Sequence, residues 1–284
     1  MDWKKLTIED KETIDNFTKG KFSTCDYNFT NLFLWSQGED LHYKIEKDVL
    51  IIQGTFVKDE YCFMPIPKDE NAIGAMKEVI KELLQKNKKI VLVPEEWKEK
   101  LEDTFILEER RDSYSIESLA LKGRKYAKKK NRVHNFMKSY NYTYEAVTPE
   151  NVEEVINFQT NWCHDKECEI VPVLRNENMG ILNLLHNFNT LGIKGGILRV
   201  DGKIVAYTLG EAISDEYVVI HIEKGLNGYT GSYQMINMAF LEKEFTDHKY
   251  VNREDDFGDE GLREAKESYH PLELLKKYEI TGIK

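Results

Sequence analysis

The sequence predicts an α/β fold with two domains in tandem, each a mixed, mostly antiparallel sheet flanked by helices. Three observations predict it: both halves show the same order of elements, each half contains a hairpin, and the only sustained basic run, residues 122–138, lies between them. A chain of 284 residues is long enough for two cores of ordinary size. We therefore expect a first domain over residues 1–120 and a second over 121–284, which opens with a basic helix over 121–140.

In the first half, helices precede a hairpin, a strand, a further helix and a final strand. The hairpin turns near Lys47 and Asp48, and the later helix carries Ile73, Met76 and Ile80 at helical spacing. The expected elements are helices over residues 7–19 and 28–37, a hairpin over 42–56, a strand over 61–67, a helix over 71–86 and a strand over 88–94.

The second half repeats this order without evident sequence identity. Its hairpin turns at Asp201-Gly202, one of the stronger short-range turn signals, and Ile236, Ala239 and Phe240 share one face of its later helix. The expected elements are helices over residues 148–163 and 177–189, a hairpin over 196–211, a strand over 216–225, a helix over 232–246 and a strand over 249–253.

The composition indicates an ordered protein. Hydrophobic residues make up 41% of the chain and the net charge is −10, which disfavours binding of a polyanion over the whole surface. No apolar run approaches the roughly 20 residues of a membrane span, and the N-terminus lacks the features of a signal peptide. We expect a cytoplasmic protein without a membrane span.

The cysteines predict neither a disulfide framework nor a metal site. Cys25, Cys62, Cys163 and Cys168 are few and scattered, so reduced thiols are expected. The spacing of Cys163 and Cys168 around His164 is compatible with zinc, but no second pair with ligand spacing stands nearby. The preferred interpretation is a helix end with one buried thiol.

The basic run has an apolar stripe and a positive face. Tyr126, Val133, Met137 and Tyr140 are expected to pack on a core, whereas the remaining positions are mainly Lys, Arg and His. Positive charge there, as on Lys125 and Arg132, is suited to an anionic group, and a solvated helix face is an equally weighted interpretation.

A glycine-bearing turn, GLNGYTGSYQMIN (residues 225–237), precedes the last long helix. Gly228 and Gly231 allow close approach of a ligand, and helix-start amides at Ser232, Tyr233 and Gln234 favour an anion. The alternative is a turn that only caps the helix, with Ser232 as an ordinary N-cap.

Polar residues crowd the end of the last predicted strand, in YVNREDDFGDEGLREAKESYHP (residues 250–271). Arg253 is suited to clamp a carboxylate or phosphate, and two aspartates after it to bind an amino group or act as a general base. Lys266 and Tyr269 lie on one face of the following helix and reach towards the same place. The alternative is a charged turn in which Asp259 caps that helix. The candidate residues at the strand end are Asn252, Arg253, Glu254, Asp255 and Asp256.

The order of elements, together with the turn at residues 225–237, resembles the GNAT acyltransferase fold in duplicate. In that fold the fourth strand splays from the fifth, and the turn contacts the pyrophosphate of an acyl-CoA. The resemblance implies a base at His221 or Glu223 on the splayed strand and a general acid at Tyr269, although both His221 and Tyr269 also fit structural roles. The basic stretch 122–155 resembles the opening of the second domain in Fem-type aminoacyltransferases, which are also tandem GNAT folds.

The C-terminal stretch, with HIEKG (221–225) and YNFTNLFLW (27–35), resembles the family named for the C-terminal part of phosphatidylglycerol lysyltransferase. The resemblance covers nearly the full length, and members known by this domain alone are mostly of unknown function. Integral lysyltransferases also carry a large membrane domain, which this sequence does not contain.

These resemblances imply an acyltransferase or aminoacyltransferase that uses acyl-CoA or aminoacyl-tRNA as donor. The donor is expected at residues 228–234, with Glu223 or Asp256 taking the proton of a small-molecule, peptide or lipid amine acceptor. A non-catalytic module that senses an anionic ligand is the competing hypothesis, and recognition of structured RNA or tRNA by residues 122–138 is a third. Motifs of P-loop NTPases, α/β-hydrolases and zincins are absent from the sequence.

Overall fold

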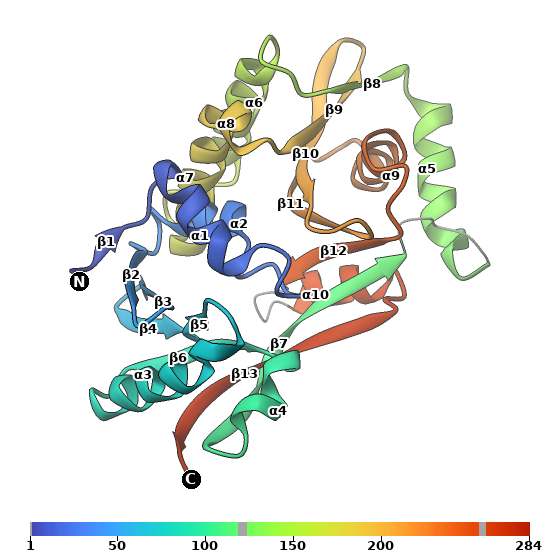
Figure 1. Ribbon diagram of the computed structural model, residues 1–284. Helices are drawn as coiled ribbons and strands as arrows, with labels where there is room; N and C mark the ends of the chain where they lie inside the picture. The colour runs from blue at the N-terminus through green and yellow to red at the C-terminus, as the bar shows by residue number, and fades with distance from the viewer. Residues whose placement is uncertain (1, 119–123, 256–259) are drawn as a thin grey trace. The chain divides into compact units, whose positions relative to one another are not determined.

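A computed structural model describes residues 2–118, 124–255 and 260–284 as an α/β protein (Figure 1). The chain divides into two compact units. Unit 1 comprises Met1–Ser113, Pro172–Gly180 and Leu275–Lys284, and unit 2 comprises Tyr114–Val171 and Ile181–Leu274. The expected boundary between residues 120 and 121 lies outside the described residues and stays a prediction. The expectation did not include the two later segments that belong to unit 1.

Unit 1 contains a mixed sheet in the order β1-β2-β3-β4-β6-β13-β7, with β5 paired to β3. This sheet includes the part of β7 (Phe105–Ser118) that ends at Ser113 and the part of β13 (Glu273–Ile283) that begins at Leu275. The other elements are β1 (Lys4–Lys5), η1 (Ile8–Asp10), α1 (Lys11–Thr18), α2 (Phe29–Trp35), β2 (His42–Glu46), β3 (Val49–Phe56), β4 (Asp59–Phe63), β5 (Ile66–Pro67), η2 (Glu70–Ala72), α3 (Ile73–Gln85), β6 (Lys89–Pro94), η3 (Glu95–Trp97) and α4 (Lys98–Leu101).

The predicted order of elements is present in unit 1. The β2-β3 hairpin turns at Lys47 and Asp48, whose φ values of 53° and 59° suit the tight turn expected there. Strands β4 and β6 pair in parallel, and α3 between them buries an apolar face. The single strand expected over residues 61–67 is wrong, because β4 ends at Phe63 and β5 pairs separately with β3.

Unit 2 contains a second mixed sheet, in the order β7-β12-β11-β10-β9-β8, which β7 enters with its residues from Tyr114. Helix α7 (Pro172–His186) contributes residues to both units. The other elements are η4 (Arg124–Tyr126), α5 (Ala127–Ser139), β8 (Tyr142–Ala146), α6 (Val152–Asp165), α8 (Phe188–Leu191), β9 (Lys194–Val200), β10 (Lys203–Ala212), β11 (Tyr217–Gly225), α9 (Ser232–Glu244), β12 (Tyr250–Asp255) and α10 (Glu260–Glu267).

The helices of unit 2 cover both faces of its sheet. Helices α5 and α9 pack together on β9 and β10 through a core that includes Phe136, Leu198 and Ile236. Helix α6 lies against the opposite face, where Gln159 accepts a hydrogen bond of 2.6 Å from the hydroxyl of Tyr207 on β10. The order hairpin, strand, helix, strand thus occurs in both units, and the predicted fold class is confirmed.

Helix α5 buries a different stripe from the predicted one. Tyr126, Val133 and Phe136 are buried, whereas Met137 is 38% exposed, so its expected place in the core is wrong. The stripe follows the spacing 126, 129, 133, 136 and 140, which alternates three and four residues as a core-facing helix does. Position 129 of this stripe is a lysine, and it is buried.

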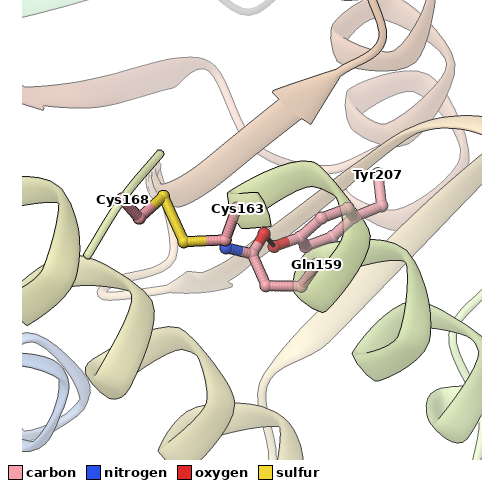
Figure 2. The surroundings of a disulfide bond; sticks show 4 residues. All are labelled: Gln159, Cys163, Cys168 and Tyr207. Atoms are coloured by element: carbon pink, nitrogen blue, oxygen red, sulfur yellow. Dashed lines mark hydrogen bonds between the residues drawn. A yellow bond between two sulfur atoms is a disulfide. The ribbon is translucent and has the colours of Figure 1, made fainter. Parts of the chain in front are cut away.

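Cys163 and Cys168 form a disulfide, which corrects the expectation of reduced thiols (Figure 2). Cys163 lies near the end of α6, and the chain then turns so that the backbone N–H of Cys168 donates to the carbonyl of Cys163 at 3.1 Å. The two Cα atoms are therefore 5.2 Å apart, which is within disulfide range. Figure 2 shows the bond beside the Gln159–Tyr207 pair.

Within residues 2–118, 124–255 and 260–284, no helix combines the length and the apolar character that crossing a bilayer requires. The same ranges contain no group of three or more His, Cys, Asp or Glu side chains placed to hold a metal ion.

Candidate functional site

Strands β11 and β12 in unit 2 part from one another along their length. They pair in parallel only at Tyr217–Tyr250, Val218–Val251 and Val219–Asn252, while β11 continues to Gly225 and β12 to Asp255. Side chains instead of a backbone ladder connect the two strands beyond this point. We call the ionisable group gathered here the Arg253 cluster; it consists of Glu117, Lys129, Glu223, Arg253 and Tyr269.

Arg253 is the centre of this cluster. Its Nη2 donates to both carboxylate oxygens of Glu223 at 3.1 Å, so this ion pair joins β12 to β11. Its guanidinium carbon lies 4.4 Å from the ring centroid of Tyr269, and Nη1 lies 3.8 Å from Oε2 of Glu117. Burial opposes the charge, but the neighbouring carboxylates outweigh it and raise the pKa of Arg253.

Lys129 approaches the same tyrosine from helix α5. Its Nζ lies 3.7 Å from the ring centroid of Tyr269, and the residue is only 7% exposed. Burial, and the positive charges of Arg253 and Arg132, lower the pKa of Lys129 to about 8. The cluster therefore holds two cations against one ring.

Two glutamates face these cations. Burial raises the pKa of Glu117 to about 7, although the charge of Arg253 acts in the opposite direction. Burial also raises the pKa of Glu223, against the effect of Arg253 and of a 3.1 Å hydrogen bond from Asn237 on α9. Glu117 on β7 is the cross-strand partner of Val251 on β12. Alternate residues of a strand face the same side, so Val251 and Arg253 share one face of β12. Glu117 lies on that face too and therefore reaches Arg253.

His221 forms a second connection between the parting strands. A β-bulge in the β10-β11 pairing gives β11 one extra residue near His221, and its two ring nitrogens lie 2.9 Å from Glu211 on β10 and 2.6 Å from Glu254 on β12. Burial of the ring lowers its pKa, but these hydrogen bonds outweigh that effect and raise the pKa to about 9. The imidazole is therefore protonated at neutral pH, and this geometry does not suit the base role expected for His221.

Further bonds fix the position of Glu254. Its backbone N–H donates to the side chain of Asn252 at 2.8 Å, and its carbonyl accepts from Nζ of Lys266 at 2.7 Å. Its φ of 58° is unusual for a residue other than glycine. Asn252, Glu254 and Lys266 thus shape the strand end rather than forming part of the Arg253 cluster.

The glycine-bearing turn packs against helix α5. Gly231, with φ of 92°, is the N-cap of α9, so the expectation that Ser232 caps the helix is wrong. A side chain at position 231 would place its Cβ 2.6 Å from the carbonyl oxygen of Arg132 on α5. The Tyr140 hydroxyl donates to the carbonyl of Gly228 at 3.2 Å. Close helix packing thus accounts for Gly231. At Gly228, by contrast, a Cβ would have no atom of the described residues within 4 Å apart from those of its two chain neighbours.

The start of α9 and the Arg253 cluster belong to one region of unit 2. Helix α9 begins one and a half turns before Asn237, which bonds Glu223, and α5 carries both Arg132 beside Gly231 and Lys129 beside Tyr269. Tyr233 is 37% exposed and Gln234 is half-buried in the first turn of α9, whereas Ser232 is buried. Figure 1 shows α5 and α9 side by side.

The structure brings together three of the predicted residues, Glu223, Arg253 and Tyr269. Lys125 lies exposed on η4, and Arg132 lies exposed on α5. Asp255 belongs to β12, and Asp256 lies outside the described residues, so its expected role stays a prediction.

Two members of the cluster, Glu117 and Lys129, were not predicted from the sequence. The spacing of the α5 stripe was a signal for Lys129, because a lysine at a core position is rarely buried without a partner. Glu117 lies in a strand that the sequence did not predict.

Comparison with known proteins gives a family and a fold. A family model described as phosphatidylglycerol lysyltransferase, C-terminal, matches residues 17–281. A conserved protein of unknown function from Bacteroides thetaiotaomicron VPI-5482 is 31% identical, with a TM-score of 0.87 over 99% of each chain. An uncharacterized protein from Mycoplasmoides gallisepticum is 24% identical over 198 residues, which are 66% of this chain and only 62% of that relative's length.

Two more distant structures bear on the fold alone. The structure of L-PGS from Bacillus licheniformis is 14% identical, with a TM-score of 0.69 over 98% of this chain and 92% of that chain. A tandem GNAT protein from the clavulanic acid biosynthesis pathway is 10% identical, with a TM-score of 0.50 over 98% of this chain and 97% of that one. The tandem GNAT-like fold predicted from the sequence is thereby confirmed.

Proposed function

Because the chain belongs to the family of phosphatidylglycerol lysyltransferase C-terminal domains, we propose that it transfers an acyl or aminoacyl group to an amine. The donor is acyl-CoA or aminoacyl-tRNA, and the acceptor is a small molecule, a peptide or a lipid that carries the amine. The observation that carries this proposal is the Arg253 cluster, which lies where β11 and β12 part and is joined to α9 through Asn237.

The start of α9 is the proposed donor site. Both donors carry phosphate groups, and a helix N-terminus favours negative charge. Helix α5 contacts this turn and adds positive charge through the exposed Arg132, and η4 before it adds the exposed Lys125. A phosphate-bearing carrier therefore finds backbone amides and cations in the same region.

The Arg253 cluster is the proposed place of chemistry. Attack on an ester or thioester carbonyl puts negative charge on its oxygen, and buried cations held in place stabilise that charge. Glu223 orients Arg253 through two hydrogen bonds, and both Arg253 and Lys129 pack against the ring of Tyr269. Arg253 and Lys129 then stabilise the oxyanion.

Ligand-induced thermal stabilisation and turnover test the proposal together. The full chain is incubated with acetyl-CoA, free CoA, and charged or uncharged tRNA, and release of the carrier is followed with a panel of amines. We expect stabilisation by one class of donor and turnover with at least one amine. Substitution Arg253→Gln is expected to lower kcat/KM by about 100-fold or more.

The matched control is Arg175→Gln, because Arg175 is exposed on α7 and lies outside the Arg253 cluster. Stabilisation without turnover would favour the sensing module over the transferase. No stabilisation by any donor would contradict both.

A further inference from the structure

Three buried polar atoms near the Arg253 cluster have no hydrogen-bond partner within the part of the chain that the structure describes. They are Oε1 of Glu117, Nη1 of Arg253 and Nδ2 of Asn252. Buried polar atoms are nearly always paired in folded proteins, and an unpaired one costs about 1–3 kcal/mol. Glu117 and Arg253 face the same side of the neighbouring strands β7 and β12, whereas Asn252 alternates to the other side. A single ligand can therefore complete the unpaired atoms of Glu117 and Arg253.

Glu117 offers an unpaired hydrogen-bond acceptor, and Arg253 offers an unpaired donor close to it. Glu117 is 2% exposed, and its other oxygen, Oε2, lies 3.8 Å from Nη1 of Arg253. One carboxylate oxygen thus needs a donor close to a guanidinium N–H that needs an acceptor. An amine attacking a carbonyl supplies both, because its N–H donates and the carbonyl oxygen accepts.

We propose that Glu117 is the general base of the transfer, with Oε1 accepting the proton of the attacking amine while Nη1 of Arg253 donates to the carbonyl oxygen. This inference rests on the proposed function. The sequence predicts the base role for Glu223 or Asp256, and of these two only Glu223 lies within the described residues.

Glu223 is less suited to that role because both of its oxygens already accept from Arg253, and one accepts from Asn237. Glu117, by contrast, has one oxygen, Oε1, that accepts no hydrogen bond from any described residue. Its pKa of about 7 also suits a base at neutral pH, since a base works best when its pKa lies near the working pH.

The step conserves atoms and charge. The neutral amine nitrogen forms a bond to the carbonyl carbon of the donor, and the carbonyl oxygen becomes an oxyanion that Arg253 stabilises. Glu117 takes one proton from the nitrogen. The carbon–oxygen or carbon–sulfur bond to the carrier then breaks, and the carrier leaves with the proton returned by Glu117. An amide forms and no oxidant or reductant is needed.

The ionisation of Glu117 is set by groups on four elements. Arg253 on β12, Lys129 on α5 and Lys266 on α10 favour the carboxylate, whereas Glu223 on β11 opposes it. Burial is the largest effect and favours the neutral acid. Transfer should therefore accelerate as the pH rises through about 7, when Glu117 loses its proton.

Substitution Glu117→Gln tests the base role, because glutamine keeps the shape of the neutral acid but cannot accept a proton. We expect kcat/KM to fall by about 100-fold or more, and the rise in rate near pH 7 to disappear. Glu109→Gln is the matched control, because Glu109 lies on the same strand but is exposed and pairs with Lys276. It should leave both the rate and the pH profile unchanged.

Two further measurements keep the test decisive if Glu117→Gln folds poorly. Glu117→Asp retains a carboxylate and should keep an ionisation in its pH profile at a reduced rate. In the unmodified protein, carbon-13 NMR should show Glu117 titrating near pH 7. Turnover that is unchanged in Glu117→Gln, or a Glu117 that titrates near the ordinary value for glutamate, overturns the base role and leaves the proposed function standing. Absence of turnover in the unmodified protein with every donor refutes both.

Discussion

Lys129 occupies a helix position whose neighbours in the stripe are apolar. Its burial removes most of the water that would solvate the ammonium group, and Arg253 adds repulsion, so the pKa falls to about 8. At pH 7 the folded state therefore carries the cost of a buried charge, which the neighbouring Glu117 and Glu223 reduce. Such a cost is typical of functional rather than structural positions.

Substitution Lys129→Met should separate stability from function. Methionine fills the same space without charge, so the free energy of unfolding at pH 7 should stay equal or increase by about 1–2 kcal/mol. Because the pKa of Lys129 is lowered in the folded state, the free energy of unfolding of the wild type should increase relative to that of the variant as the pH rises from about 8 towards 10.5. Urea unfolding at pH 7 and 10 measures this, and transfer activity should be lost. A large destabilisation at pH 7 would contradict this account of Lys129.

His221 should make the opposite contribution. Its pKa is raised from 6.5 to about 9 in the folded state, so its stabilising contribution is fully present below about pH 6.5 and is lost as the pH rises through about 9. His221→Gln should lower the free energy of unfolding at pH 6 by roughly 3 kcal/mol, and the difference from wild type should shrink towards pH 9.5. Urea unfolding across this range measures the difference. His164→Gln is the control, because His164 is exposed.

Single site residues could be predicted from the sequence where the residues next to them in the chain indicated a site. Glu223 lies near the end of one apolar strand and Arg253 near the end of another. Their opposite charges alone indicate an ion pair. Glu117 gave no such signal, because its importance comes from pairing with Val251, which is more than 130 residues away in the chain. The protonation of His221 likewise depends on Glu211 and Glu254, which its position on a strand does not reveal.

At the scale of elements, the turn before α9 is fixed by its contact with α5. Gly231→Ala should destabilise the protein by about 1–3 kcal/mol or more, because alanine meets both an unfavourable φ and the Arg132 carbonyl. Gly228→Ala is the matched control: its φ of 94° is equally unfavourable, but its surroundings are open. Thermal unfolding should therefore show a larger loss for Gly231→Ala, together with weaker donor binding. Equal losses would mean that the α5 contact is unimportant.

Elements defined by local signals were predicted well. The hairpins at Lys47-Asp48 and Asp201-Gly202 are confirmed because turn chemistry acts within four residues. Strands β7 and β13 were missed, because FILEERRDSYSIES and ELLKKYEITGI mix charges with apolar residues and pair with distant parts of the chain. The disulfide was missed for a different reason: the cysteines are few and scattered in the sequence, and the local turn after α6 that brings two of them together was not predicted.

At the scale of the whole molecule, unit 1 depends on the C-terminal strand. Residues from Leu275 pair with β6, and Leu275, Tyr278 and Ile280 are buried. Deletion of residues 275–284 should therefore unfold much of unit 1, which loss of amide hydrogen-exchange protection in β6 would report. Lys276→Ala is the control: it removes only the exposed ion pair with Glu109 and should change stability by less than about 1 kcal/mol. Retained protection in β6 after the deletion would contradict this dependence.

The chain returns to unit 1 twice after it has entered unit 2, so a division of the sequence at a single boundary was incomplete. Periodicity identifies where an element begins and ends, but it carries no information on which sheet a late strand joins. Residues 172–180 and 275–284 join unit 1 after the chain has entered unit 2. This organisation follows from long-range pairing, which the order of elements does not specify.

The bridge from Glu211 through His221 to Glu254 has a consequence for ligand entry. A charged imidazole at this position holds three strands at a set separation where the backbone ladder between β11 and β12 has ended. A substrate arriving between them need not break main-chain bonds to make room, so little free energy is spent on rearrangement before chemistry begins. Because Oε1 of Glu117 and Nη1 of Arg253 are buried, capture by the proposed mechanism should then need movement of side chains only, with no separation of paired strands.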